Sequence, residues 1–128
     1  MLRMATLLDK AQLFRSLHVP GKPLVLPNAW DGASARVVAD AGAAAIATTS
    51  AGVAWSLGHG DGDHMTRDQA LGAITRIAAT VDVPVTADIE RGYATDPDGV
   101  AETVRGVLAA GAVGINLEDT LRSVAEQA

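Results

Sequence analysis

Residues 83–90 read VPVTADIE and residues 112–119 read AVGINLED, and both apolar runs end in an acid. In an extended chain Val85, Ala87 and Ile89 share one face, while polar or acidic side chains occupy the other. This alternation predicts strands with a buried face and a polar face that ends in carboxylates, as at the mouth of a β/α barrel. An open doubly wound sheet buries both faces and needs continuous apolar runs, so the pattern favours the barrel.

Strand and helix patterns alternate along the whole chain, which indicates a parallel sheet. Between the first strand and its helix no G-x-G-x-x-G occurs, which disfavours a dinucleotide-binding fold. Strands are predicted over 24–27, 43–50, 83–90 and 112–119. Helices are predicted after the N-caps Thr6, Asp31, Thr66 and Asp96, with a further helix beginning in 120–128 and a long Gly-rich loop over 51–65.

The number of predicted strands is half of what a barrel needs. A complete (β/α)₈ barrel has eight strands and about 250 residues. This chain has 128 residues and four strand–helix units. We therefore expect residues 1–128 to form a single α/β domain, the first half of a TIM barrel, truncated within the helix after the fourth strand. Its two open parallel edges predict pairing with another chain, hence a homo-oligomer.

The composition excludes several classes of function. A net charge of −5 and a pI of about 4.9 argue against a nucleic-acid face and against binding to anionic membranes. Without cysteine, the chain has no disulfide and no thiolate zinc site. No apolar run approaches the roughly 18 residues of a membrane span, and residues 1–10 lack the apolar core of a secretory signal. We expect a cytoplasmic protein.

Three acids are predicted to meet at one edge of the sheet. Asp88 and Glu90 lie on one face of the third strand, and Glu118 ends the adjacent strand on the equivalent face. Oxygen ligands suit Mg²⁺ or Mn²⁺ better than zinc. Asp61 and Asp63, in the long loop after the second strand, could reach the same rim. The alternative is that these are ordinary solvated acids or partners of Arg91.

A second candidate site follows the second strand. Ser50, Ala51 and Gly52 could turn successive backbone N–H groups toward the barrel mouth. Such a nest binds a carboxylate or phosphonate oxygen. The alternative is a plain turn of small residues.

Three motifs resemble those of the isocitrate lyase/phosphoenolpyruvate mutase superfamily. They are LPNAWDGASARVVADAGAAAIATTSAGVAWSLGHGDGD (26–63), VTADIERGYA (85–94) and GINLEDT (114–120). The resemblance implies a (β/α)₈ barrel that binds Mg²⁺ at its C-terminal mouth. It also implies cleavage or rearrangement of C–C or P–C bonds in small 2-oxo or 2-hydroxy acids through an enolate-like intermediate.

The resemblance also implies roles for individual residues. Asp88 matches the acid closest to the metal, Glu90 stands where many members have Asp, and Glu118 completes the metal set. Asp61 matches the acid of a loop that approaches the metal, so Asp61 and Glu118 are the catalytic candidates. The implied substrate-binding positions are Ser50, Ala51, Gly52, Trp30 and Tyr93.

The sequence departs from the family pattern in two places. Ala94 replaces the usual Gly of a Gly-Tyr-Gly turn. The Lys-Arg-Cys-Gly-His type motif of the lyases should follow Glu118, but residues 119–128 read DTLRSVAEQA. A cysteine-dependent lyase mechanism is therefore not expected. Two interpretations stay open: a fragment of a lyase, decarboxylase or mutase, and an inactive half-barrel that only retains the metal-rim residues.

Overall fold

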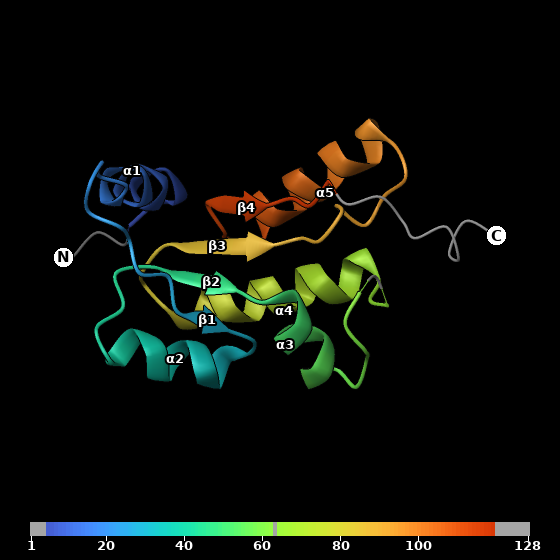
Figure 1. The fold of residues 1–128 in the computed structure, drawn as a ribbon, viewed down its shortest axis with the longest axis horizontal. Helices are drawn as coiled ribbons and strands as arrows, with labels where there is room; N and C mark the ends of the chain where they lie inside the picture. Colours follow the sequence, from blue (N-terminus) through green and yellow to red (C-terminus); the bar gives the residue numbers. More distant parts are fainter. Residues whose placement is uncertain (1–4, 63, 120–128) are drawn as a thin grey trace.

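The computed structural model describes residues 5–62 and 64–119, which form one parallel sheet and its surrounding helices (Figure 1). The strands pair in chain order, β1-β2-β3-β4, and all pairs are parallel. The strands are β1 (Asn28–Ala29), β2 (Ile46–Thr48), β3 (Val85–Asp88) and β4 (Gly114–Asn116). The helices are α1 (Leu7–Leu17), α2 (Gly32–Asp40), α3 (Ser50–Ser56), α4 (Arg67–Thr80) and α5 (Pro97–Ala109).

Helices α2, α4 and α5 cover the same face of the sheet. Ala35, Ile77 and Val107, one from each helix, share a buried cluster with the strand residues Ile46 and Val85. Small side chains let these helices approach closely: a methyl group on Gly32 of α2 would meet Thr80 of α4 at 2.9 Å. Helices on one side of a parallel sheet are the arrangement of a barrel wall, as the strand pattern predicts.

The opposite face of the sheet carries a row of small and polar residues, one from each strand. The register aligns Asn28, Ala47, Thr86 and Gly114 across the four strands. Helix α1 closes the amino end of this face, because a Cβ built on Gly114 would lie 3.1 Å from the ring of Phe14. Asp88, two residues beyond Thr86, is therefore carried past this row toward the carboxyl edge.

The predicted alternation of β3 is confirmed within the strand. Val85, Ala87 and Ile89 lie in the helix-covered core, and Asp88 is in register with Asn116 of β4 on the other face. The strand ends at Asp88, however. Glu90 is therefore positioned by the turn that follows and not by strand alternation.

The first strand was predicted too early in the chain. The pattern LVLP predicts a strand over 24–27, but pairing with β2 begins at Asn28. Only the carbonyl of Pro27 contributes to the ladder, by accepting from Ala47 N–H at 3.1 Å, since proline has no N–H to donate. The second and fourth strands are also shorter than predicted, and cover Ile46–Thr48 and Gly114–Asn116.

Helix α3 begins at Ser50, the last residue of the predicted second strand, and continues into the stretch predicted as loop. Thr49 caps it, with the Thr49 hydroxyl accepting from Gly52 N–H. The four predicted N-caps Thr6, Asp31, Thr66 and Asp96 are confirmed. Asp63 and the helix predicted to begin in 120–128 lie outside the described residues. Among the described residues, no helix is long and apolar enough to cross a membrane.

Candidate functional site

Asp88, the last residue of β3, is held at the carboxyl edge of the sheet by three hydrogen bonds. Its backbone N–H donates to Thr48 Oγ1 at 2.9 Å. The backbone N–H of Ser50 donates to Asp88 Oδ2 at 3.2 Å, and that of Glu90 donates to Oδ1 at 3.1 Å. Each carboxylate oxygen thus has a fixed direction and retains a lone pair for a further ligand.

The chain turns tightly after β3. Glu90, Gly92 and Tyr93 have φ values of 49°, 86° and 52°, in the left-handed region that side chains disfavour. Thr103 of α5 is buried and donates from its hydroxyl to the Gly92 carbonyl at 2.6 Å. A Cβ on Gly92 would lie 2.9 Å from Val100, so no larger residue fits there without a shift. Helix α5 therefore maintains a costly turn, of the kind found at functional sites.

Glu90 lies inside this turn and is only 6% exposed. Burial raises the pKa of its carboxyl above the usual range, and the negative charges of Asp61 and Asp88 raise it further. The Tyr93 hydroxyl and the Gly62 backbone act in the opposite direction. The pKa of Tyr93 is also raised, first by burial and then by the charge of Glu90. The charges of Asp61 and Asp88 thus act on the Glu90 carboxyl, and the roles of these acids at a metal site stay predictions.

Glu118 joins the same edge through its backbone. Its N–H donates to the Glu90 carbonyl at 2.7 Å, and this extends the contact between the ends of β3 and β4. The Glu118 side chain is exposed. The structure therefore brings Glu118 beside the acids, while its role as a ligand or catalytic residue stays a prediction.

Residues 50–52 form the first turn of α3 and not an open loop. Ser50 N–H is engaged by Asp88, and Gly52 N–H donates to Thr49 Oγ1 at 3.3 Å. Two of the three proposed nest donors therefore already have acceptors within the protein. The nest was predicted without the Thr49 cap, and its binding of a substrate carboxylate stays a prediction.

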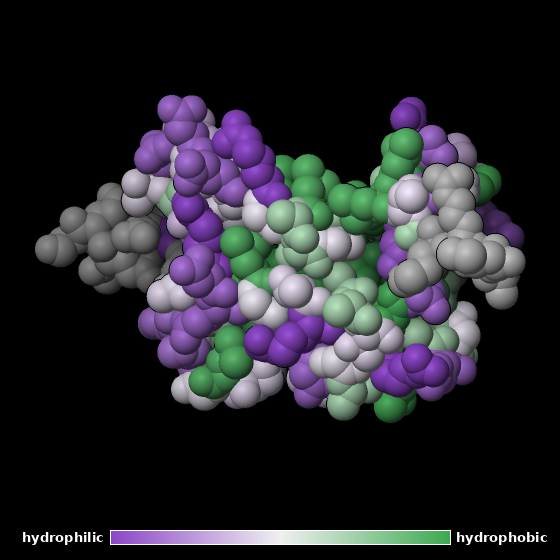
Figure 2. Space-filling view, turned by 180° about the vertical axis from the view of Figure 1, so that it is seen from behind, coloured by the Kyte–Doolittle hydropathy of each residue, from purple (hydrophilic) through white to green (hydrophobic). Residues whose placement is uncertain are grey.

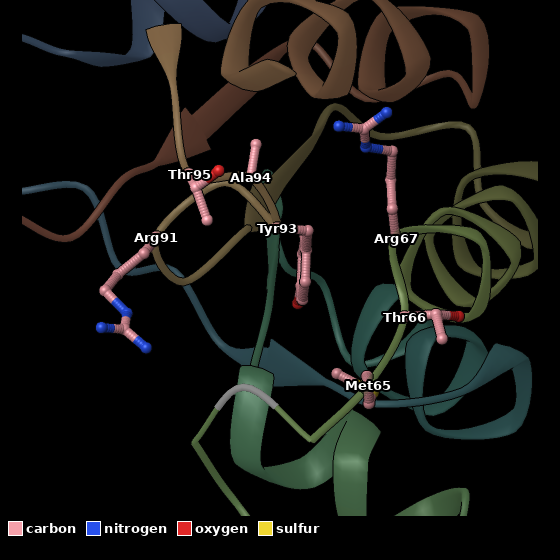
Figure 3. Close-up of a pocket in the computed structure, with 7 residues that line it drawn as sticks. All are labelled: Met65, Thr66, Arg67, Arg91, Tyr93, Ala94 and Thr95. Atoms are coloured by element: carbon pink, nitrogen blue, oxygen red, sulfur yellow. The ribbon is translucent and has the colours of Figure 1, made fainter. Parts of the chain in front are cut away.

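The predicted aromatic residues line two different pockets. Trp30 lies against α3, where a pocket of about 550 Å³ is lined by Asn28, Trp30, Thr49, Ala51, Gly52, Trp55 and Ser56. Tyr93 lines another, of about 520 Å³, with Met65, Thr66, Arg67, Arg91, Ala94 and Thr95. Figure 3 shows Tyr93 between Arg67 and Arg91.

Several positioning residues were not predicted from the sequence. Arg67, the first residue of α4, donates to the Gly99 carbonyl at 3.0 Å and to Glu102 at 3.3 Å, so it ties α4 to α5. Thr48 holds Asp88, and Thr103 holds the turn that follows β3. Each contact joins residues more than ten positions apart, and no local pattern marks such a pair.

The donor atoms at this edge suit a hard cation. Asp61, Asp88 and Glu90 offer only oxygen, and a cation would relieve the like charges that raise the pKa of Glu90. Within 5–62 and 64–119, no three His, Asp or Glu side chains are arranged to hold an ion together. Mg²⁺ commonly takes one or two carboxylates and completes its shell with water. The residues therefore fit an ion bound mainly at Asp88, and not a cage of three carboxylates.

Comparison with known proteins gives this arrangement a context. The family model described as phosphoenolpyruvate phosphomutase matches residues 14–128. An uncharacterized protein of Mycobacterium tuberculosis is 44% identical over 107 residues, which cover 84% of this chain and 40% of that protein. The 2-methylisocitrate lyase of Escherichia coli is 34% identical over 115 residues, which cover 81% of this chain and 39% of the lyase.

Solved structures match over a similar range. A provisionally assigned phosphonomutase from Burkholderia cenocepacia has a TM-score of 0.88 and 47% identity, over 93% of this chain and 47% of its own. The 2,3-dimethylmalate lyase, a member of the PEP mutase/isocitrate lyase superfamily, has a TM-score of 0.79 and 32% identity, over 93% of this chain and 39% of its own. The described fold thus matches the N-terminal part of a TIM barrel, and the chain spans less than half the length of these relatives.

The raised pKa of Glu90 predicts a pH effect on stability. With metal removed by EDTA, the folded chain keeps a proton on Glu90 that the unfolded chain loses above its reference pKa of 4.5. Wild type should therefore lose stability as the pH rises from about 4.5 through the raised pKa. Glu90→Gln cannot titrate, so its unfolding free energy relative to wild type should rise over this interval, measured by urea titration.

Asp82→Asn, at an exposed position, controls for a general charge effect. A difference between Glu90→Gln and wild type that stays constant from about pH 4 to pH 7 would contradict the assignment.

Proposed function

The chain belongs to the phosphoenolpyruvate mutase/isocitrate lyase family, and on this premise we propose that the whole protein is a Mg²⁺-dependent lyase or mutase. It would cleave or rearrange a C–C or P–C bond of a small 2-oxo or 2-hydroxy acid through an enolate-like intermediate. The observation that carries this proposal is the fixed carboxylate of Asp88 at the carboxyl edge of β3, beside Asp61 and Glu90. Barrel enzymes work at this edge.

Different acids of the chain would bind the metal and act in catalysis. Asp88 would hold the ion directly, and Glu90 and Glu118 would hold it through water. The bound ion, Mg²⁺ or Mn²⁺, would supply a Lewis acid that neutralises the charge of the developing enolate. Asp61, on the loop between α3 and α4, would approach from the open side and act with Glu118 as a catalytic residue.

The substrate would lie between these acids and α3. We place its carboxylate near residues 50–52, with Trp30 and Tyr93 as the aromatic neighbours. The names of two relatives, 2-methylisocitrate lyase and 2,3-dimethylmalate lyase, support a small organic acid. We propose no nucleic-acid or membrane partner, because the net charge is −5, and the cytoplasm stays the predicted location.

A second proposal concerns residues 1–128 by themselves. The mouth of a complete barrel is built from eight loops. The described residues supply the loops that follow β1, β2 and β3, and the chain spans less than half the length of the relatives. We therefore propose that these residues alone bind the metal at the rim without turnover, whereas the whole protein is the enzyme.

Metal binding tests the central assignment. Asp88→Ala removes the carboxylate that faces the predicted ion, so it should abolish the binding of Mg²⁺ and Mn²⁺, measured by isothermal titration calorimetry. Asp82→Ala removes an equal charge at an exposed position and should bind as wild type does. If Asp88→Ala and wild type bind these ions with equal affinity, Asp88 is not a metal ligand.

Catalysis by the whole protein gives a separate test. It should turn over one of oxaloacetate, methylisocitrate and phosphonopyruvate, and EDTA should lower the rate by orders of magnitude. Glu118→Gln keeps the shape of the side chain but weakens its hold on the ion, so it should reproduce part of this loss. Turnover that survives EDTA, or full activity of Glu118→Gln, would assign the rim acids a structural role.

Self-association is proposed from the edges of the sheet. In the described chain, β1 and β4 each have a partner strand on one side only. Large apolar side chains near these edges are exposed, including Val25 at 77% and Leu117 at 50%. Figure 2 shows hydrophobic surface along the upper middle of one face of the molecule, next to a mostly hydrophilic region at the upper left. Unpaired edges and exposed apolar surface of this kind favour a homo-oligomer.

Light scattering can decide this point. The 128-residue chain should be larger than a monomer at micromolar concentration. Ile115→Lys places a charge on the β4 edge and should shift the mass toward the monomer. Leu8→Lys, at an exposed site on α1 outside the sheet, should not. A stable, cooperatively unfolding wild-type monomer would contradict the proposal.

A further inference from the structure

We propose that Thr48 is a positioning residue for Asp88, whose hydroxyl fixes the end of β3 so that the Asp88 carboxylate faces a metal ion. The proposal rests on the metal-binding role of Asp88 in the proposed function. It assigns Thr48 an indirect part, because its only described contact with the site is the 2.9 Å hydrogen bond from Asp88 N–H to Oγ1.

This hydrogen bond lies where the pairing of β2 with β3 ends. Along the two strands, Ile46 is in register with Val85, and Ala47 with Thr86. One step later β2 ends at Thr48, and the next residue, Thr49, already caps α3. A side-chain hydroxyl, and not the next backbone carbonyl, therefore accepts the N–H of Asp88.

The segment from Thr48 to Ser50 holds both the backbone and the carboxylate of Asp88. Thr48 accepts the backbone N–H, and two residues later the N–H of Ser50 donates to Oδ2 of the carboxylate. The donor at Oδ1 is the backbone of Glu90. Of the three partners of Asp88, only Thr48 contributes a side-chain atom, so its contact is the one that a substitution of the partner's side chain deletes directly.

Thr48 is itself held firmly. It is 4% exposed, and it is in register with Ala29, whose side chain lies in the helix-covered core. Because the Thr48 side chain is buried and has little room to move, its hydrogen bond fixes the end of β3 relative to β2. Hydrogen-bond partners of metal ligands typically change metal affinity by about 10–100-fold when they are removed.

The test compares two buried threonines. Thr48→Val has nearly the same shape but no hydroxyl, and it should weaken Mn²⁺ binding by about 10-fold or more, measured by electron paramagnetic resonance of free Mn²⁺. Thr48→Ser restores the hydroxyl and should restore most of the affinity. Thr86→Val is the matched control, since Thr86 is 5% exposed and lies on β3 two residues before Asp88, outside the hydrogen bonds that hold Asp88.

Amide hydrogen exchange gives a readout that does not depend on metal. In Thr48→Val the amide of Asp88 should exchange faster than in wild type, while amides of the core strands keep their protection. In Thr86→Val the exchange at Asp88 should stay as in wild type. Unchanged exchange at Asp88 in Thr48→Val would overturn the proposal.

The outcomes separate the two claims. If Asp88→Ala abolishes Mn²⁺ binding but Thr48→Val binds as tightly as wild type, the positioning role is wrong and the proposed function stands. Equal losses in Thr48→Val and Thr86→Val would also overturn it, because they would reflect general destabilisation. If wild type binds no Mn²⁺, or if Asp88→Ala binds as wild type does, the metal role of Asp88 and the inference that rests on it are both overturned.

Discussion

The described site depends on the hydrogen bonds that fix Asp88 where β3 ends. At Asp88 the pairing of β3 with β2 has ended while its pairing with β4 continues at Asn116, so on the β2 side the residue depends on other hydrogen bonds. Here the segment from Thr48 to Ser50 accepts the backbone N–H of Asp88 and donates to its carboxylate. The cap of α3 at Thr49 fixes the conformation of that segment. One local feature, the change from β2 to α3, thus positions an acid 38 residues further along the chain.

The turn after β3 shows the cost of this arrangement. Glu90 and Tyr93 both have positive φ, and Glu90 is buried near two other acids. Each of these features is unfavourable. They persist because α5 holds the turn through the buried Thr103 and through packing at Gly92. A cation at the rim would offset the repulsion between these acids. The proposed metal would therefore account for the close placement of three carboxylates.

The helix layer makes this rim possible without contributing acids to it. Core side chains in the described sheet and helices are mostly small, and Gly32 and Gly106 sit where a Cβ would meet a neighbouring helix at less than 3 Å. Close packing of this kind leaves little room for rearrangement. The strands are therefore fixed relative to one another, and so are the residues at their carboxyl ends.

The sequence by itself determined the parallel α/β architecture, four N-caps, the two faces of β3 and the acid Asp88 at the end of that strand, because these follow from periodicity and from residue types close in the chain, whereas the place of Glu90 comes from the turn after β3. Tertiary structure alone decided that β1 begins at Asn28, that residues 50–52 start a helix, and that Thr48 holds Asp88. The reason is physical. Strand ends, short helices and the partners of buried polar groups depend on what other segments offer across the fold, and no local pattern encodes that.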